Sequence, residues 1–261
     1  MRMRAFLGWL RGERQHCKMA AIPTLEDEDA KRPHRERETL VGERTTIINR
    51  LKATMTRLGI RNFNPKLVKA SERLEHVRTP EGEPIPPNTQ AELLRDMQRL
   101  RLVREQIGQI EKARLEHLKR NPNTGPNLMV CVLARVIGIG IETADMLVQE
   151  VLSRNLRDRR AVARYGGVTG SPDESGSRSR EKGLARSGNA RVRRGMIQLA
   201  WRFLEFQKDS ALAKWFRART ENAPRSRKKM IVALARKLLI ALWHLVRDGV
   251  VPEGVVLRPA H

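Results

Sequence analysis

Apolar side chains recur at three- and four-residue steps through two long stretches in the first half of the chain. The first stretch starts near Glu38 and stops at Gly59, and the second follows the proline-rich segment 79–88. This spacing puts the apolar side chains on one face of an α-helix, and the prolines exclude regular structure between the two stretches. The sequence therefore predicts two long amphipathic helices with these apolar positions: Leu40, Val41, Ile47, Ile48, Leu51, Met55 and Leu58, then Leu93, Met97, Leu100, Val103, Ile107, Ile110 and Leu118.

Two helices of this kind cannot bury their apolar faces alone. They can pack against each other as an antiparallel hairpin, or against a second copy of the chain as a coiled coil. We expect both: a hairpin over residues 38–120 with a Pro-rich loop, and self-association into a homo-oligomer through residues 38–118. A bundle within one chain is the alternative.

The remainder of the chain also has helical patterns. The apolar run 128–136 leads into the turn Gly138-Ile139-Gly140, and further amphipathic stretches continue to Gly249, with almost no strand signal. The predicted fold class is mainly α: a long helical hairpin or coiled coil, followed by a compact helical domain with a helix-hairpin-helix-like glycine turn. We divide the chain at 1–37, 38–120, 127–250 and 251–261, the last being a tail.

The charge balance narrows the choice of partner. Lys and Arg number 52 against 29 Asp and Glu, which gives a formal net charge of +23. This excess would repel itself without a polyanion, so nucleic acid is the expected partner of either an enzyme or a basic RNA-structural protein. A membrane is not expected, because no apolar run approaches the ~20 residues that span a bilayer. Cys17 and Cys131 are isolated, so we expect a reduced, cytoplasmic protein without disulfides or a zinc site.

The turn Gly138-Ile139-Gly140 has two interpretations. A dinucleotide-binding loop is disfavoured, because such a loop follows a strand and a helix-like run precedes this turn. A turn between two helices can aim backbone N–H groups and a helix N-terminus at a phosphate, which would make Gly138 and Gly140 nucleic-acid contacts. The same turn can serve only to pack two helices together, and the sequence leaves both interpretations open.

Ser175 lies in the polar, glycine-rich segment 171–183, which is predicted to be an exposed loop. A nucleophilic serine needs exposure, and it needs cations nearby that stabilise charge on a phosphoryl group. Solvation or a phosphate contact is the plainer interpretation, and Ser171, Ser177 and Ser179 compete for the role. The candidate nucleic-acid-binding cations that follow are Arg178, Arg180, Lys182, Arg186, Arg191, Arg193 and Arg194.

Gly188 and Asn189 are predicted to turn into a helix whose first turns are basic. Cations at a helix N-terminus oppose the helix dipole, so an anion such as a phosphate backbone is expected beside them. This adds Asn189 to the candidate nucleic-acid contacts. A second basic run, 225–229, opens the last helix, where phosphate contact and simple solvation fit the sequence equally well.

Several segments resemble, in the same order, the C-terminal domain of the IS110/IS116/IS902 family of bacterial insertion-sequence transposases. They are ARVIGIGIETADMLVQEV, ARYGGVTGSPDESG, GLARSGNARVRRGMIQLAW and ALAKWFRA, and residues 21–67 are similar to the connecting region of the same proteins. The resemblance implies DNA transposition by site-specific recombination, in oligomers guided by an element-encoded RNA, in the bacterial cytoplasm and at the nucleoid. It implies that Ser175 is the catalytic serine, and that Gly188, Asn189 and the arginines after them hold nucleic acid.

The family also has a RuvC-like domain with a metal-binding acidic set, which is expected ahead of the segment matching AFLGWLRGE at residues 5–13. The chain starts at that segment, so residues 1–37 are expected to hold a remnant of that domain and a connector. We accordingly expect no metal or cofactor in this chain, and Mg²⁺ only in intact members. The prediction is a truncated transposase that is inactive alone. The alternative is a non-catalytic nucleic-acid-binding protein, or a regulator that forms mixed oligomers with an intact transposase.

Overall fold

The structure, a computed structural model, describes residues 6–8, 10–13, 23–67, 69–175, 178–184, 187–222 and 224–259, with the side chains of 171–175, 178–183 and 224 left out. The chain divides into two compact units, Met1–Arg32 and Pro33–His261, which we describe separately. In the first unit, α2 (Leu25–Asp29) begins after Thr24. The Thr24 hydroxyl accepts a hydrogen bond from the Asp27 N–H, and the Asp27 carboxylate accepts one from the Thr24 N–H, which fixes the start of this helix.

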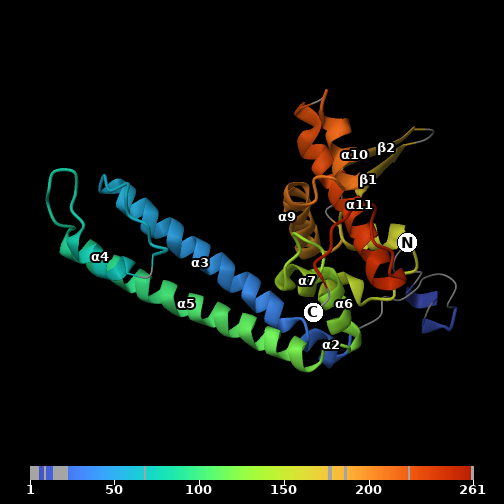
Figure 1. Cartoon of the computed structure of the whole chain (residues 1–261), viewed down its shortest axis with the longest axis horizontal. Coiled ribbons are helices and arrows are strands. Elements are labelled where there is room, and N and C mark those ends of the chain that lie inside the picture. Colours follow the sequence, from blue (N-terminus) through green and yellow to red (C-terminus); the bar gives the residue numbers. More distant parts are fainter. Residues whose placement is uncertain are drawn as a thin grey trace. The chain divides into compact units, whose positions relative to one another are not determined.

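The second unit contains the predicted helical hairpin, formed by α3 (Arg32–Arg57) and α5 (Pro87–Arg120), which lie side by side (Figure 1). The helices run antiparallel, because Arg37 pairs with Glu111 near one end and Arg50 pairs with Asp96 further along. The short helix α4 (Ala70–His76) packs on α5. The hairpin core consists of Leu40, Ile47, Ile48, Leu51, Met55, Ala70, Leu74, Ile85, Leu93, Met97, Leu100, Val103 and Ile107.

The apolar seam of the hairpin is filled within a single chain. The apolar side chains of the two predicted helices meet across α3 and α5, except Leu118, which packs in the core of the helical body. Self-association through residues 38–118 would therefore use the outer faces, where Leu102 and Leu115 are exposed. That self-association stays a prediction.

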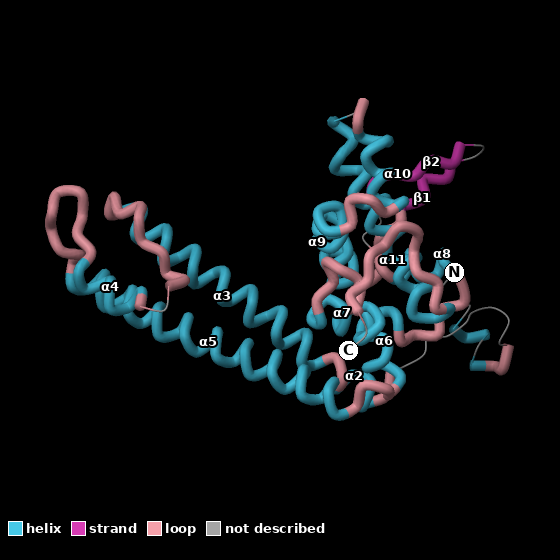
Figure 2. The backbone as a smooth tube through the Cα atoms, in the orientation of Figure 1, coloured by secondary structure: helices cyan, strands magenta, loops and turns pink. Residues whose placement is uncertain are grey.

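The rest of the second unit is a helical body, which confirms the mainly α fold class (Figure 2). Its longest helix, α11, packs against α6, α8, α9 and α10 around one apolar core. Within the described part of the chain, no helix has both the length and the apolar character needed to cross a bilayer. The elements are α6 (Gly125–Ala134), α7 (Ile141–Leu147), the π-helix η1 (Val148–Leu152), α8 (Arg159–Tyr165), α9 (Ala190–Phe206), α10 (Ala211–Thr220), the 3-10 turn η2 (Pro224–Ser226) and α11 (Arg227–Asp248).

A β-hairpin stands where the sequence predicted a loop. Strands β1 (Gly170–Ser175) and β2 (Arg178–Leu184) pair antiparallel, with an irregularity in register between Gly170 and Ser171. The segment lacks the alternation of apolar and polar residues that marks a half-buried strand, so periodicity could not reveal it. Each strand of a two-stranded sheet is an edge strand, which is why Pro172 is tolerated in β1.

The predicted tail, 251–261, docks on the body over its described residues. Leu257 forms an isolated bridge with Val136, and the Arg258 N–H donates to the Arg135 carbonyl over 2.6 Å. The buried amide of Gln207 donates to the carbonyls of Ile137 and Val256 over 2.8 and 2.9 Å, and it accepts a hydrogen bond from the Val256 N–H. The end of the chain is thus tied to the turn between α6 and α7.

Candidate nucleic-acid interface

The start of α9 is built by two residues that the sequence singled out. Gly188 has φ +86°, and a Cβ there would lie 2.6 Å from the Arg164 carbonyl oxygen, so only glycine fits. Asn189 caps the helix, because its Oδ1 accepts hydrogen bonds from the N–H groups of Arg191 and Val192 over 3.0 and 3.3 Å. The helix start and its arginines therefore have a fixed orientation.

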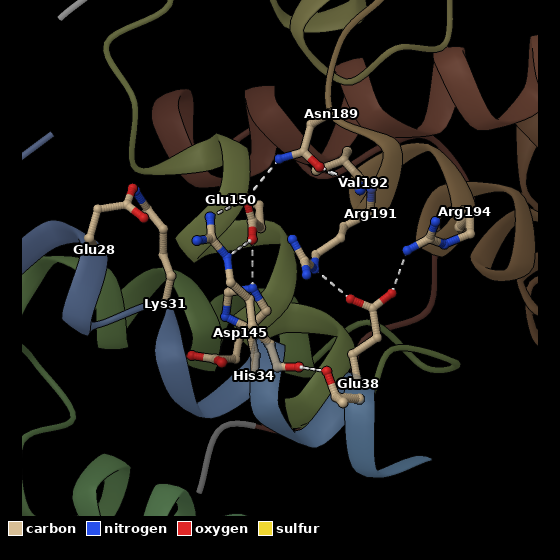
Figure 3. A network of polar contacts seen from close by, with 12 residues as sticks. Glu28, Lys31, His34, Glu38, Asp145, Glu150, Asn189, Arg191, Val192 and Arg194 are labelled. Atoms are coloured by element: carbon tan, nitrogen blue, oxygen red, sulfur yellow. Dashed lines mark hydrogen bonds and ion pairs between the residues drawn. The ribbon is translucent and has the colours of Figure 1, made fainter. Parts of the chain in front are cut away.

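The buried carboxylate of Glu150 accepts hydrogen bonds from three side chains (Figure 3). Asn189 donates from Nδ2 over 2.7 Å, His34 lies with Nε2 at 2.8 Å, and Arg35 donates from Nε over 2.8 Å. Burial raises the pKa of the Glu150 carboxyl, but these hydrogen bonds lower it by more. The pKa therefore lies well below its ordinary value. Glu150 therefore carries its charge at neutral pH. It lies on the π-helix η1 and joins the starts of α3 and α9.

Glu38 supplies the anion beside the basic first turns of α9. Its carboxylate oxygens lie 2.5 Å from Nε of Arg191 and 2.6 Å from Nη2 of Arg194 (Figure 3). Burial raises the pKa of Glu38, and the two arginines lower it to a net value below the ordinary one. In this structure a carboxylate of α3 occupies the position where the sequence predicted a phosphate.

A further ion network joins the base of the hairpin to α7. Arg114 pairs with Glu142 and, through Nε at 3.1 Å, with Asp145, while Arg37 lies 2.9 Å from Glu142. Burial raises the pKa of Asp145, against the lowering effect of Arg114 and His34. Between α3, α7 and α9 lies a pocket of about 280 Å³, lined by residues of both networks: His34, Arg37, Glu38, Val41, Glu142, Thr143, Met146, Arg191, Arg194, Gly195, Gln198, Leu199 and Arg202.

The glycine turn is largely engaged inside the fold. Gly138 has φ +98°, and a Cβ there would lie 3.1 Å from Cβ of Phe206. The Ile137 N–H donates to the Val256 carbonyl, and the Ile139 carbonyl accepts from Arg258. These contacts favour the packing interpretation for Gly138, whereas Gly140, at the start of α7, is exposed and none of the described atoms crowds it.

Ser175 ends β1 and stands opposite Arg178 in the register of the hairpin. Arg180 stands opposite Asp173, and Lys182 stands opposite Ser171, while the side chains of these strand residues and all of Arg186 lie outside the described residues. The Asn189 N–H donates to the Tyr165 carbonyl over 2.7 Å, so the start of α9 is joined to the end of α8, the helix that precedes the hairpin. The β-hairpin and the α9 arginines thus belong to the same compact unit, Pro33–His261.

Arg193 points away from the Glu38 pair. Its Nη1 donates to the Ser187 carbonyl over 3.4 Å at an exposed position. The sequence identified Asn189 and the arginines of α9 but not the residues that hold them: Glu38 pairs with Arg191 and Arg194. Glu150 accepts from Asn189 and is also bound by His34 and Arg35. His34 and Glu150 are 116 positions apart, and no local pattern reports a contact of that range. Among the described residues, no three His, Cys, Asp or Glu side chains gather in a way that could hold a metal ion.

Comparison with known proteins gives a family match over this region. Residues 131–216, which include the glycine turn, the β-hairpin and α9, match the model of the transposase IS116/IS110/IS902 family. The chain is 40% identical over 264 residues to a Sinorhizobium fredii protein named "Putative transposase y4rJ", across 98% of this chain and 67% of that one. It is 28% identical over 235 residues to the Yersinia enterocolitica "Transposase for insertion sequence element IS1328", across 88% of this chain and 66% of the other. The chain therefore spans about two thirds of the length of these relatives.

Proposed function

The chain belongs to the IS116/IS110/IS902 family of transposases, and from this premise we propose that it acts in DNA transposition by binding DNA and presenting Ser175 to a phosphodiester. The observation that carries the proposal is the β-hairpin. It sets Ser175 opposite Arg178, and it precedes α9 in the chain, where three arginines lie within four residues: Arg191, Arg193 and Arg194.

The chemistry of such a serine is a substitution at phosphorus. The Ser175 Oγ would attack the phosphorus of a DNA phosphodiester and form a phosphoserine link to one DNA end. The bond from phosphorus to a deoxyribose oxygen breaks, and that oxygen leaves as a hydroxyl after taking a proton. Cations beside the serine stabilise the extra negative charge in the transition state.

The arginines of α9 can exchange a carboxylate for a phosphate. The side chains of Glu38 and Arg191 are 39% and 38% exposed, and that of Arg194 is 62% exposed. Ion pairs of such exposure contribute only about 0–1 kcal/mol, so a DNA phosphate can take the place of Glu38 at little cost. Asn189 and Gly188 would act here by fixing the helix start, and the pocket between α3, α7 and α9 would admit the phosphate.

We further propose that the chain works with partners, namely a guide RNA encoded by the same insertion sequence and further copies of itself. The family resemblance supports both partners, and the charge of +23 supports the first. The outer faces of α3 and α5 are available for contacts between copies, since the inner faces are already paired.

A test of the proposal is whether Ser175 forms a covalent link to DNA. The purified chain is incubated with the DNA that flanks its own gene, alone and with the part of the Sinorhizobium fredii relative that has no counterpart here. Adducts are then counted after denaturation. Ser175→Ala should abolish the adducts and leave DNA affinity unchanged, and Ser71→Ala, an exposed serine of α4, should change neither.

Two other outcomes would change the assignment. Adducts that survive in Ser175→Ala would move the nucleophile to Ser171, Ser177 or Ser179. DNA binding without any adduct in either reaction would favour a non-catalytic regulator of intact transposases.

A further inference from the structure

A groove of about 1150 Å³ runs along α11 at the edge of the apolar core, where Val168, Val232 and Ile240 line it. It is bounded by α8, α10 and α11, and by Gly170 and Leu184 at the base of the β-hairpin. Six cations line it and, among the described residues, no carboxylate does. The cations are Arg159, Arg160, Lys228, Lys229, Arg236 and Lys237.

The groove lies along a second face of α11, distinct from the fully buried one. One face of the helix enters the core, with Leu234, Leu238 and Leu242 fully buried. The groove face carries cations and half-exposed aliphatic residues in alternating pairs, since Lys228 and Lys229 precede Val232 and Ala233, and Arg236 and Lys237 precede Ile240 and Ala241. These positions recur at three- and four-residue steps, so they share one side of the helix.

The charge of this face is not balanced inside the described part of the chain. None of the six cations forms an ion pair with a described residue, and the one ring contact is that of Lys237, whose Nζ lies 4.9 Å from the centre of the Trp215 ring. Lys228 and Lys229 also lie in the first turn of α11, where the helix dipole disfavours cations. A polyanion in the groove would relieve both costs.

We infer that this groove binds a single DNA strand and leads it to the β-hairpin. The inference rests on the proposed function, because it assumes that Ser175 meets DNA. The groove opens at Gly170, the first residue of β1, and Ser175 is five positions further, about 17 Å along an extended strand. A strand leaving the groove would pass along the hairpin toward the serine.

The residues that line the groove favour a single DNA strand over other ligands. An acidic protein segment would also match the cations, but the proposed substrate of the chain is DNA. Duplex DNA turns its bases inward and offers mainly phosphates and sugars, whereas a single strand exposes apolar base faces as well. The aliphatic floor, formed by Val168, Leu212, Val232 and Ile240 between rows of cations, suits a single strand.

Charge-neutral variants of the whole chain test the inference. Lys229→Gln combined with Arg236→Gln removes two charges from the groove. Arg101→Gln combined with Lys112→Gln removes two exposed charges from α5 and is the matched control. Binding of a labelled single DNA strand, the same sequence as duplex, and the same sequence as RNA is measured by fluorescence anisotropy over a range of salt concentrations.

The groove variant should bind the single DNA strand about tenfold more weakly at physiological salt. The plot of log K against log salt should also become less steep by about 1.4, which is about 0.7 for each of the two lost phosphate contacts. The control should keep the affinity and slope of the unmodified chain, because charges on α5 act on the groove only through screened solvent. Thermal unfolding of both variants should match that of the unmodified chain, since none of the substituted side chains is buried.

A photoreactive side chain gives a readout that does not depend on charge. Placed at Ile240, it should crosslink to the DNA strand, and placed at Leu102, on the outer face of α5, it should not. Equal loss of affinity in the groove and control variants, or equal crosslinking at both positions, overturns the inference. The inference is also overturned if the groove variant loses affinity only for duplex DNA or only for RNA and not for the single DNA strand. If the unmodified chain binds no DNA at all, the proposed function fails with it; if it binds DNA and the groove variant binds equally well, only the groove is wrong.

Discussion

Asn189 donates a hydrogen bond from its side-chain Nδ2 to Oε2 of Glu150 over 2.7 Å, while its Oδ1 caps the first turn of α9. One amide thus joins a helix start to a buried anion that also holds His34 and Arg35. The orientation of the α9 arginines depends on this link.

The first prediction concerns this amide. Asn189→Ala should lower the free energy of unfolding by about 2–4 kcal/mol, because α9 loses its cap and a buried carboxylate loses a donor. Asn189→Asp keeps a cap but places a second carboxylate against Glu150, so it should not restore stability. Urea unfolding measures both. Asn123→Ala, at an exposed loop position, is the control, and equal stability of Asn189→Ala and this control would show that the link contributes nothing.

The second prediction follows from the pKa of Glu150. Burial raises this pKa, but hydrogen bonds from His34, Arg35 and Asn189 bring it below the ordinary value of 4.5. The unfolded chain therefore takes up a proton first, so the stabilising contribution is complete above about pH 4.5 and is lost as pH falls below it. Asp145, whose pKa is raised by burial, acts in the opposite direction: its folded form binds the proton more readily, so acid favours folding at that group.

Glu150→Gln isolates this pH dependence. The variant should be less stable than the unmodified chain at neutral pH, and its free energy of unfolding should fall less steeply below pH 4.5. Glu72→Gln, at an exposed position on α4, should leave the pH profile unchanged. If the free energy of unfolding of Glu150→Gln and of the unmodified chain falls equally with pH, the pKa of Glu150 is not lowered in the folded chain.

The third prediction compares two glycines of similar backbone conformation. Gly188 and Gly249 have φ of +86° and +69°, but a Cβ at Gly188 would lie 2.6 Å from two backbone atoms, whereas none of the described atoms lies within 4 Å of one at Gly249. Gly249→Ala should cost about 1–2 kcal/mol, from the left-handed conformation alone. Gly188→Ala should cost about 3–5 kcal/mol, because the backbone must also move. Similar losses in thermal stability would show that the turn before α9 is not tightly packed.

The sequence revealed those parts of the fold that depend on local pattern. Leu51 and Leu100, predicted on the apolar faces of two helices, are buried in the hairpin core, because a three- and four-residue period is a property of the helix itself. The turn at Gly188 and Asn189 into a helix was also predicted from neighbouring residues, and the structure places the start of α9 there. Strands β1 and β2 were not predicted, because their sequence lacks the alternation of apolar and polar residues by which a strand is recognised.

Only part of the candidate site could be predicted from the sequence, because its partners lie far apart in the chain. Arg191 and Arg194 stood out as cations at a helix start, but Glu38 lies more than 150 positions before them and was assigned to the hairpin. Gln207, which ties the end of the chain to the α6–α7 turn, carried no signal at all, because its partners are backbone groups. Pairings across such separations depend on the whole fold.

The fourth prediction concerns a charge inside the hairpin. Only 4% of the Asp96 side chain is exposed. Arg50 donates to both carboxylate oxygens of Asp96, each over 2.6 Å, and Arg99 donates to one of them over 3.1 Å. Arg50→Ala should lower the free energy of unfolding by about 2–3 kcal/mol, since the buried carboxylate keeps one partner. Asp96→Leu should cost under about 1 kcal/mol, because it removes the buried charge and leaves the two arginines in water, their side chains being 44% and 63% exposed. Urea unfolding compares the two, with Arg101→Ala as a surface control. A larger loss for Asp96→Leu than for Arg50→Ala would mean that the ion pair itself, rather than the avoidance of an unpaired buried charge, stabilises the hairpin.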